Sequence, residues 1–385
     1  MSDVGLGADS AAHEVAQACP ACRRTVSRGL RECPFCGQGL ERRPPAARPG
    51  SRRARLREAL GGYAFLAPNT IGFLIFTLLP VLAAFLLSFT DWDAVRPIRN
   101  WPEARSLWVG PRHYADILGF RHDEAGHLKP NDERFWKCCY NTVFMMLGIP
   151  IAMALSLLTA LFMNQKLRGI VVFRTLYFIP SICSAVAVAM LWRWLYNPEF
   201  GLANDLLRGL HLVTPGAGGL LNGPLEALGL KQSGEQLKWI ADPAWAKPAL
   251  IIMGLWVAIG GQNCILYLAG LQGIPQELYE VAEIDGAGRW QKLRYITWPM
   301  LAPTTFFIFV MSIIYGFQSG FVGIHVLTHG GPAGATTNLL YYIYNHAFEW
   351  FKMGRASALA MILFAVVFTV TLINWKFGRR GVEYL

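Results

Sequence analysis

Long runs without a charged residue dominate the sequence. Five of them, each of membrane-spanning length, contain no Lys, Arg, Asp or Glu: residues 62–90, 138–165, 175–192, 248–276 and 356–375. A sixth run, 295–348, is too long for one helix, but Gly330-Gly331-Pro332 leaves one helix at about 299–321, followed by a polar loop. Because about 20 apolar residues cross the hydrocarbon core of a bilayer, the pattern predicts six transmembrane helices.

Several prolines fall within or at the ends of these runs, among them Pro80, Pro150 and Pro180. Proline kinks a transmembrane helix, and neighbouring helices satisfy the carbonyl that it frees. Ordinary packing is the simpler interpretation, and we favour it at each position.

The composition favours a membrane protein over a large soluble one. Charged residues make up 16% of the 385 residues and hydrophobic residues 54%, whereas a soluble domain carries about 25% charged residues. Buried helices of a soluble protein are the alternative, but six runs of this length are hard to explain without a bilayer. The sequence therefore predicts an all-α integral membrane protein.

Arginine and lysine are unevenly distributed between the segments that connect the predicted spans. The first 61 residues contain eleven Arg, and the connection 164–169 and the tail after residue 375 are also basic. The positive-inside rule places these segments in the cytoplasm, so both termini are expected there. The net charge of +10 then comes mostly from arginines beside the first span. Nucleic-acid binding by the arginine-rich segment 42–57 is the disfavoured alternative.

The segment before the first span divides into three parts. Residues 1–18 have the composition of a disordered N-terminus, residues 19–40 contain a cysteine module, and residues 41–59 form an Arg/Pro-rich linker that cannot bury a core. The transmembrane domain is expected over residues 60–380, and residues 381–385 form a tail.

Four cysteines of the module have the spacing of a metal site. Cys19-Pro-Ala-Cys22 is followed by ten residues and then by Cys33-Pro-Phe-Cys36. Two such knuckles present four thiolates in the tetrahedral arrangement that Zn²⁺ prefers, and the reducing cytoplasm disfavours disulfides. We therefore expect Cys19, Cys22, Cys33 and Cys36 to bind one structural zinc as a zinc-ribbon-like module. Iron binding or a redox role is the alternative.

The connection between the fourth and fifth predicted spans is the most informative one. Pro275 suits the first turn of a helix, and acidic residues follow in the early turns, where the helix dipole favours them. One face of this helix carries Leu278, Val281, Ala282 and Asp285. Gly286 and Gly288 are expected to end it, and a second short helix leads into the next span. A helix lying on the membrane surface is the alternative.

This connection resembles the signature of the permease subunits of ABC importers. The signature is E-A-A, three residues, Gly, nine residues and I-x-L-P, and the chain has Glu280-Val281-Ala282, Gly286 and Ile296-Thr297-Trp298-Pro299 at that spacing. Val281 and Trp298 replace the usual Ala and Leu. The resemblance implies that the helix docks into a cleft on a cytoplasmic ATPase subunit. The residues expected to couple the two proteins are Glu280, Val281, Ala282, Asp285, Gly286, Ala287, Ile296 and Pro299.

Two further segments resemble the carbohydrate-uptake branch of this family. One runs from Arg174 through Pro180 to Gly201, and the other from Leu327 through Gly330-Gly331-Pro332 to Gly354. The resemblance covers about residues 60–380 and excludes the cysteine module. It implies a permease subunit in the bacterial cytoplasmic (inner) membrane that forms half of the translocation path for a sugar or related polyol. The implied partners are a cytoplasmic ATPase dimer, a second permease subunit in a heterodimer, an extracytoplasmic substrate-binding protein and membrane lipid, without nucleic acid.

Two other classes of function compete with a permease subunit. The sequence has no G-x4-G-K-[ST] motif, so ATP hydrolysis is expected in a separate subunit and this chain is not expected to be an enzyme. A secondary transporter is the first alternative, but the predicted spans carry no Asp or Glu of the kind that proton-coupled carriers use. A membrane enzyme using the cytoplasmic zinc is the second, but four thiolates leave that metal no open position.

Polar side chains within the predicted spans are the candidates for substrate contacts. They are Gln262 and Asn263 in the fourth span and Gln318 and Ser319 in the fifth, with Trp256 as an aromatic neighbour. Amides and aromatic rings suit a hydroxyl-rich ligand, but hydrogen bonding between helices explains each polar residue equally well. The sequence does not identify the sugar.

Overall fold

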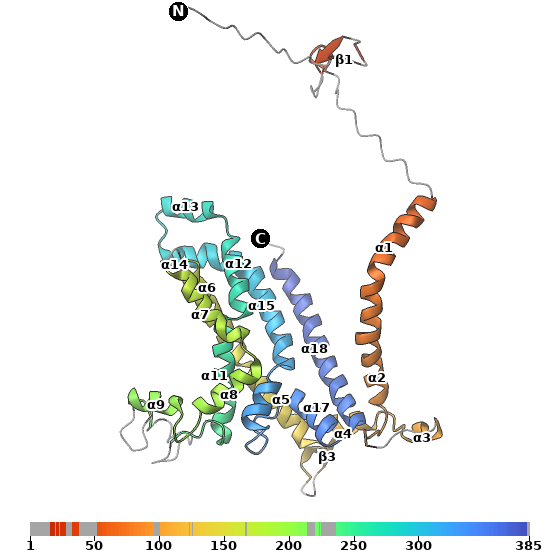
Figure 1. Cartoon of the computed structure of the whole chain (residues 1–385), viewed down its shortest axis with the longest axis vertical. Coiled ribbons are helices and arrows are strands. Elements are labelled where there is room, and N and C mark those ends of the chain that lie inside the picture. Colours follow the sequence, from red (N-terminus) through yellow and green to blue (C-terminus); the bar gives the residue numbers. More distant parts are fainter. Residues whose placement is uncertain are drawn as a thin grey trace, which may run out of the picture. The chain divides into compact units, whose positions relative to one another are not determined.

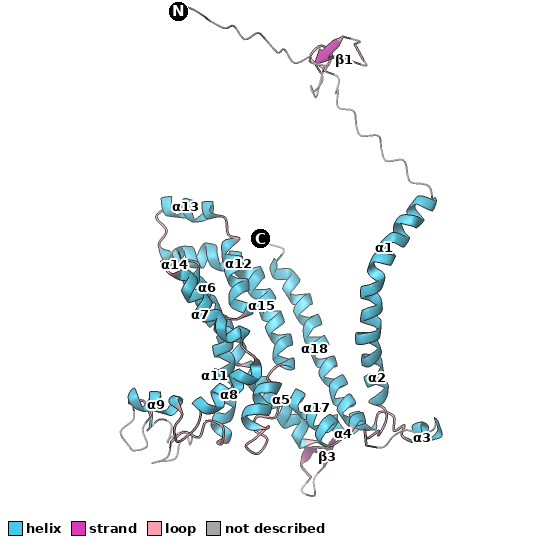
Figure 2. Cartoon of the chain, viewed as in Figure 1, coloured by secondary structure: helices cyan, strands magenta, loops and turns pink. Residues whose placement is uncertain are grey.

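The computed structural model of the chain is helical apart from two short hairpins (Figures 1 and 2). The structure describes residues 16–19, 21–22, 24–27, 33–37, 52–95, 101–122, 124, 126–165, 168–213, 220–222, 224 and 236–382. Contacts divide the chain into two units, Met1–Leu79 and Pro80–Leu385.

The first unit contains the cysteine module, in which β1 (Ala16–Ala18) and β2 (Thr25–Ser27) pair antiparallel. Residues 1–18 were expected to be disordered, but β1 occupies the last three of them. Residues 1–15 and the linker up to residue 51 lie outside the described residues. A continuous helix then consists of α1 (Arg52–Phe73), the π-helical turn η1 (Leu74–Leu78) and α2 (Leu79–Leu87). Its segment Ala59–Leu87 is long and apolar enough to cross a membrane.

The second unit contains four more segments of spanning length and one bent helix pair among its described residues. The segments are α5 (Glu133–Met146) with α6 (Gly148–Met163); α11 (Pro243–Ile259) with α12 (Gln262–Gln272); α14 (Arg289–Lys292), η2 (Leu293–Thr297), α15 (Trp298–Gln318), α16 (Phe321–Gly323) and η3 (Ile324–Thr328); and α18 (Met353–Val382). The chain therefore has five spans, or six if the bent pair counts as one. The prediction of about six transmembrane helices is confirmed.

The third predicted span, 175–192, is not one straight helix. α7 (Ile170–Ile182) and α8 (Ala185–Leu195) meet at an angle of 97°. Pro180 lies in the last turn of α7, so this proline accompanies a helix end instead of packing within a continuous helix. Breaks of this kind follow the loss of a backbone donor at proline.

Two other spans are interrupted at glycines. Gly260 and Gly261 separate α11 from α12, and Ser319 and Gly320 separate α15 from α16. A Cβ on Gly260 would lie 1.7 Å from the carbonyl oxygen of Tyr177 in α7. The close contact between this break and α7 therefore requires glycine at position 260. The fifth predicted helix therefore ends at Gln318, and the chain continues as α16 and η3 where a polar loop was expected.

The two ends of the second unit carry different elements. One end, which we call the α13 end, carries α13 (Gln276–Ile284) and the C-terminal end of α18 (Figure 1). The opposite end, the α17 end, carries α4 (Arg112–Leu118), the antiparallel hairpin of β3 (Phe120–His122) and β4 (Leu128–Pro130), α9 (Leu202–Gly209) and α17 (Leu339–Tyr344) (Figure 1). The turn η4 (Asn345–Glu349) follows α17, and α3 (Trp101–Ser106) precedes α4.

Local sequence fixes three helix starts at the α17 end. The carboxylate of Asp132 accepts a hydrogen bond from the N–H of Phe135 and caps α5, while Asp242 caps α11 ahead of Pro243. The amide of Asn338 caps α17 in the same way. Such caps satisfy amides that have no partner within a helix. Between the ends, α6, α12 and α15 share a buried cluster that includes Met153, Ala160, Cys264, Tyr267, Leu301 and Ile308.

Candidate functional site

The predicted coupling helix is α13, and its end is set by glycine. The helix ends at Asp285, and Gly286 has a φ of +75°, a left-handed conformation that residues with a Cβ rarely adopt. This turn lets the N–H of Ala287 donate to the carbonyl of Ala282 at 2.8 Å. The chain then reverses into α14, whose first turn is closed by the side chain of Gln291 accepting from the N–H of Gly288 at 2.7 Å. The predicted order of helix, glycine turn and helix is confirmed.

Two contacts hold α13 against the segment that follows it. Lys292 and Glu283 form an ion pair at 2.5 Å, and the hydrogen bond from Lys292 lowers the pKa of the Glu283 carboxyl. Because Glu283 is mostly exposed, solvent screens this pair and its contribution to stability is small. The hydroxyls of Tyr279 and Thr297 lie 2.8 Å apart, and Thr297 is buried. The Tyr279 contact therefore connects the helix to the body of the protein.

The other face of α13 is apolar and open to solvent. Leu278, Val281 and Ile284 are 42%, 58% and 86% exposed. Glu280 is exposed beside them and, in the described part of the chain, makes no hydrogen bond or ion pair. Apolar side chains at positions i, i+3 and i+6 on an exposed helix are typical of a helix that inserts into a groove of another protein.

The predicted coupling residues divide into two groups. Glu280, Val281, Asp285 and Gly286 are exposed, and Ala282 and Ala287 are half-buried at the base of the turn. In contrast, Ile296 packs against the buried cluster around α6, α12 and α15, and Pro299 lies in the first turn of α15. The first group is available to a partner, whereas the second anchors the connection.

The candidate substrate-path residues lie beside helix breaks, a feature that the charge pattern did not reveal. Gln262 and Asn263 directly follow the Gly260-Gly261 break, and Gln318 and Ser319 adjoin the break before α16. The amide of Asn263 donates to the Ser312 hydroxyl at 3.4 Å, and the Ser319 carbonyl accepts from Asn338 at 3.2 Å. Trp256 packs edge-on against Trp192. No hydrogen bond in the described part of the chain joins the α12 pair to the α15 pair.

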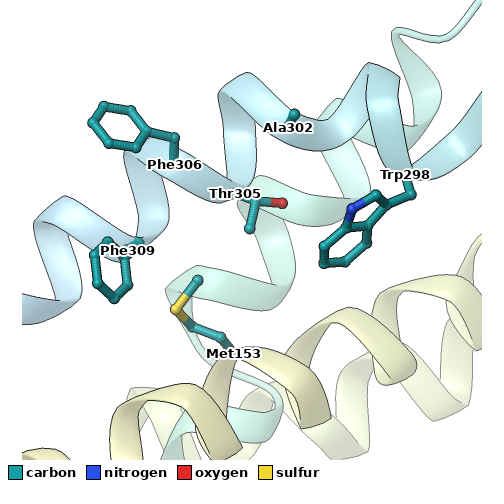
Figure 3. A pocket seen from close by; sticks show the side chains of 6 residues that line it. All are labelled: Met153, Trp298, Ala302, Thr305, Phe306 and Phe309. Atoms are coloured by element: carbon teal, nitrogen blue, oxygen red, sulfur yellow. The ribbon is translucent and has the colours of Figure 1, made fainter. Parts of the chain in front are cut away.

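A cavity of about 280 Å³ between α6 and α15 does not suit a sugar (Figure 3). Its wall consists of Met153, Trp298, Ala302, Thr305, Phe306 and Phe309. The Thr305 hydroxyl and the Trp298 indole are the polar groups among these side chains, so the surface suits an apolar chain or side chain instead.

The four cysteines of the module converge as the metal-site prediction requires. Their sulfur atoms all lie within 4.8 Å of one another, and the Cys19–Cys36 and Cys22–Cys33 pairs are each 3.7 Å apart. A tetrahedron of sulfurs at about 2.3 Å from Zn²⁺ has edges of about 3.8 Å, and a disulfide is about 2.0 Å long. The distances therefore fit four thiolates around one metal. Backbone N–H groups of Cys22 and Ala21 lower the pKa of Cys19 to about 6, which favours the thiolate that binds metal.

A buried ionic cluster at the α17 end was missed by the sequence analysis. Arg355 of α18 donates to the carboxylate of Asp132 at 2.6 Å, and the hydroxyl of Tyr342 donates to both carboxylate oxygens at 3.2 and 3.0 Å. Burial opposes ionisation, but these bonds and that from Phe135 outweigh it and lower the pKa of Asp132. Burial likewise lowers the pKa of neighbouring His346 to about 4, so its ring is neutral. A carboxylate before an apolar run signals a cap, but nothing local indicates an arginine 223 residues away.

Known proteins resemble this chain over most of its length. A family model described as "Binding-protein-dependent transport system inner membrane component" matches residues 140–377. The Probable ABC transporter permease protein YesP of Bacillus subtilis is 31% identical over 86% of this chain and 94% of its own. The Trehalose/maltose transport system permease protein MalF of Thermococcus litoralis is 30% identical over 85% of this chain and 96% of its own. A subunit of a bacterial ABC transporter that imports the acidic polysaccharide alginate has the same fold, with a TM-score of 0.65 at 24% identity over 85% of this chain and 98% of its own.

Proposed function

Because the chain belongs to the family of binding-protein-dependent transport system inner membrane components and is thus a multi-pass, non-catalytic permease subunit of an ABC importer, we propose that it imports a sugar or related polyol. The relative from Thermococcus litoralis bears the name of a trehalose/maltose permease, which supports a carbohydrate. We also propose that the second half of the translocation path comes from a different permease subunit, and that an extracytoplasmic binding protein delivers the solute.

The observation that carries the coupling role is the exposed apolar face of α13 beside Glu280. This helix is held to the body of the protein by Tyr279 and Thr297 on one side, while Leu278, Val281 and Ile284 face solvent on the other. A docked ATPase that moves on ATP binding would transmit force to α15 through this connection. The proposed contact residues are Glu280, Val281, Ala282, Asp285, Gly286 and Ala287, with Ile296 and Pro299 as anchors.

The proposed orientation places the α13 end in the cytoplasm. The C-terminal end of α18 lies at this same end (Figure 1), and the basic residues Lys376, Arg379 and Arg380 near the end of this helix agree with a cytoplasmic location. An even number of spans then puts the N-terminus on the same side. The α17 end faces outward and receives the binding protein.

We further propose that the cysteine module holds one structural zinc ion. The 3.7 Å sulfur separations and the lowered pKa of Cys19 support it. Four thiolates complete the coordination of the metal, so the ion would fix the fold of the module and take no part in transport. Near the helix breaks, Gln262, Asn263, Gln318, Ser319 and Trp256 are the proposed substrate-path residues.

Reconstitution tests the function directly. The chain is co-expressed with candidate ATPase, permease and binding-protein subunits from its source organism, and uptake of radiolabelled sugars and polyols into ATP-loaded proteoliposomes is measured. We expect saturable uptake of at least one of these solutes that requires both ATP and the binding protein. Uptake driven by a proton gradient without ATP, or uptake of no carbohydrate in a complex that transports another solute, would contradict the proposal.

A further inference from the structure

Two lysines from different helices border the same loop near the α17 end. Lys137 lies in the second turn of α5, and Lys247 lies in the second turn of α11. Asn141, one turn beyond Lys137 on α5, accepts a hydrogen bond from the Lys247 ammonium at 3.3 Å. Lys137 donates to the carbonyl of Ala333, and Asn141 donates to the carbonyl of the next residue, Gly334, so both ammonium groups border the same loop.

The lysine pair is fixed by its surroundings. Lys137 donates to the carbonyl of Ala333 at 2.7 Å, and the Lys247 nitrogen lies 4.7 Å from the ring centres of both Tyr140 and Phe144. The Asn141 side chain is 1% exposed, and its amide nitrogen donates to the carbonyls of Gly334 and Thr337. A buried amide with three bonds therefore holds the two helices and the 333–337 loop together.

Among the residues that the structure describes, neither lysine has an acidic partner. Within the described ranges, no carboxylate lies within 4.0 Å of either ammonium. Each ammonium has three N–H donors, and each uses one in the bonds above. Two positive charges that border one loop repel each other, and the repulsion grows where water is partly excluded. An anion that accepts from both would relieve the repulsion and use the free donors.

We propose that Lys137 and Lys247 form an oxyanion site that binds the carboxylate or phosphate group of a hydroxyl-rich anionic solute. The exposed ring of Tyr140, 59% open to solvent, offers a face against which a sugar ring packs beside the bound charge. The inference rests on the proposed function and narrows its substrate class to acidic or phosphorylated carbohydrates. A phospholipid headgroup carries the same oxyanion chemistry, so the test must separate the two sources.

The experiment measures the acetylation rate of individual lysines in the complete transporter. The complex is placed in nanodiscs of phosphatidylcholine alone and treated with acetic anhydride, and each lysine is quantified by mass spectrometry. Galacturonate, glucose 6-phosphate and glucose are the probes, at one ionic strength. We expect both anions to slow Lys137 and Lys247 at least about five-fold, as charge-assisted hydrogen bonds would, while glucose leaves both rates unchanged. Lys352, exposed and outside the pair, should react equally throughout.

Variants test whether the two lysines act together. Lys247→Met should raise the galacturonate concentration that half-protects Lys137 about ten-fold, equivalent to about 1.4 kcal/mol, and Lys137→Met should do the same for Lys247. Lys352→Met makes the same change of charge and should have no effect. Equal protection by glucose and galacturonate, or no protection by either anion, would overturn the proposal.

Two further conditions of the same experiment distinguish a solute from other groups that could occupy the site. Protection in phosphatidylglycerol nanodiscs that needs no solute and resists galacturonate would identify a lipid headgroup and overturn the solute site. Protection that appears only with the binding protein would identify a docking contact and overturn it too. None of these measurements depends on sugar uptake by the complex. Failure of the oxyanion site can therefore be distinguished from failure of the proposed function.

Discussion

Gly286 offers the sharpest test of the coupling connection, because its substitution changes the backbone preference and little else. Its φ is +75°, and an added Cβ would meet no atom within 4 Å. An alanine there would therefore clash with none of the residues that the structure describes. Its cost comes from the left-handed backbone conformation alone, which is roughly 1–2 kcal/mol for a residue with a Cβ.

The size of that cost decides the expected effect. One to two kcal/mol lowers the population of the native turn by a factor of about 5–30. Other backbone conformations of residue 286 would lose the hydrogen bond from the N–H of Ala287 to the carbonyl of Ala282. The angle between α13 and α14 would then no longer be fixed. Gly286→Asn is the matched control, since asparagine enters the left-handed region more readily than alanine does. We expect Gly286→Ala to reduce coupling several-fold and Gly286→Asn to retain most of it.

Three measurements on each variant separate coupling from folding: the amount in the membrane, co-purification of the ATPase, and ATP hydrolysis stimulated by the loaded binding protein. Membrane levels should stay near wild type, since the turn is exposed, whereas the other two should fall in Gly286→Ala. If Ala and Asn variants behave alike, or if both match wild type in all three assays, the left-handed turn has no part in coupling.

Three further predictions concern other parts of the chain. Glu280→Lys reverses an exposed charge and should leave membrane insertion intact but weaken ATPase co-purification and uptake, with Glu280→Gln showing a smaller loss; equal wild-type behaviour would remove Glu280 from the contact. Replacing Cys19, Cys22, Cys33 and Cys36 with Ser should abolish about one zinc per chain, measured by elemental analysis, without preventing insertion; zinc content unchanged in this variant would refute the site. Asp132→Asn leaves Arg355 without its counter-charge and should destabilise the α17 end by about 3 kcal/mol, seen as a lower Tm. Since the pKa of Asp132 is lowered in the folded state, wild type should lose this stabilisation only as the pH falls below about 4, whereas the Asn variant should lack that pH dependence; a Tm unaffected by the substitution at pH 7 would contradict the role of the pair.

The spanning segments were predictable because the hydrocarbon core of a bilayer sets the length of an apolar helix that crosses it. Charge-free runs located the spanning segments, and the spacing of Glu280, Gly286 and Pro299 located the two helices and the glycine turn that we propose as the coupling connection. The bend between α7 and α8 was not predictable from the same pattern, because a bent pair of helices has the same apolar composition as a straight one. Pro180 was the local signal, and a proline is equally compatible with a continuous helix.

Contacts between distant segments could not be predicted for a different reason. The residues around Asp132 in the sequence predict a helix cap at this position. Tertiary packing determines its other partners, Tyr342 and Arg355. The lysine pair is similar, since Lys137 and Lys247 each look like ordinary lysines near the end of a span. Only the fold brings them together through Asn141.

The bonds that close the α17 end also impose an order on biogenesis. Asp132 and Asn141 of the second span find their partners at Gly334, Thr337, Tyr342 and Arg355. At a synthesis rate of about 5–20 residues per second, Asp132 waits roughly 10–45 s for Arg355 to emerge. Until these partners are synthesised, the Asp132 carboxylate lacks its hydrogen-bond donors and the Asn141 amide nitrogen lacks its acceptors. A chain truncated before α18 would keep the partners of Asn141 but would leave the Asp132 carboxylate without Arg355 permanently, which gives membrane proteases a means of recognising an incomplete product.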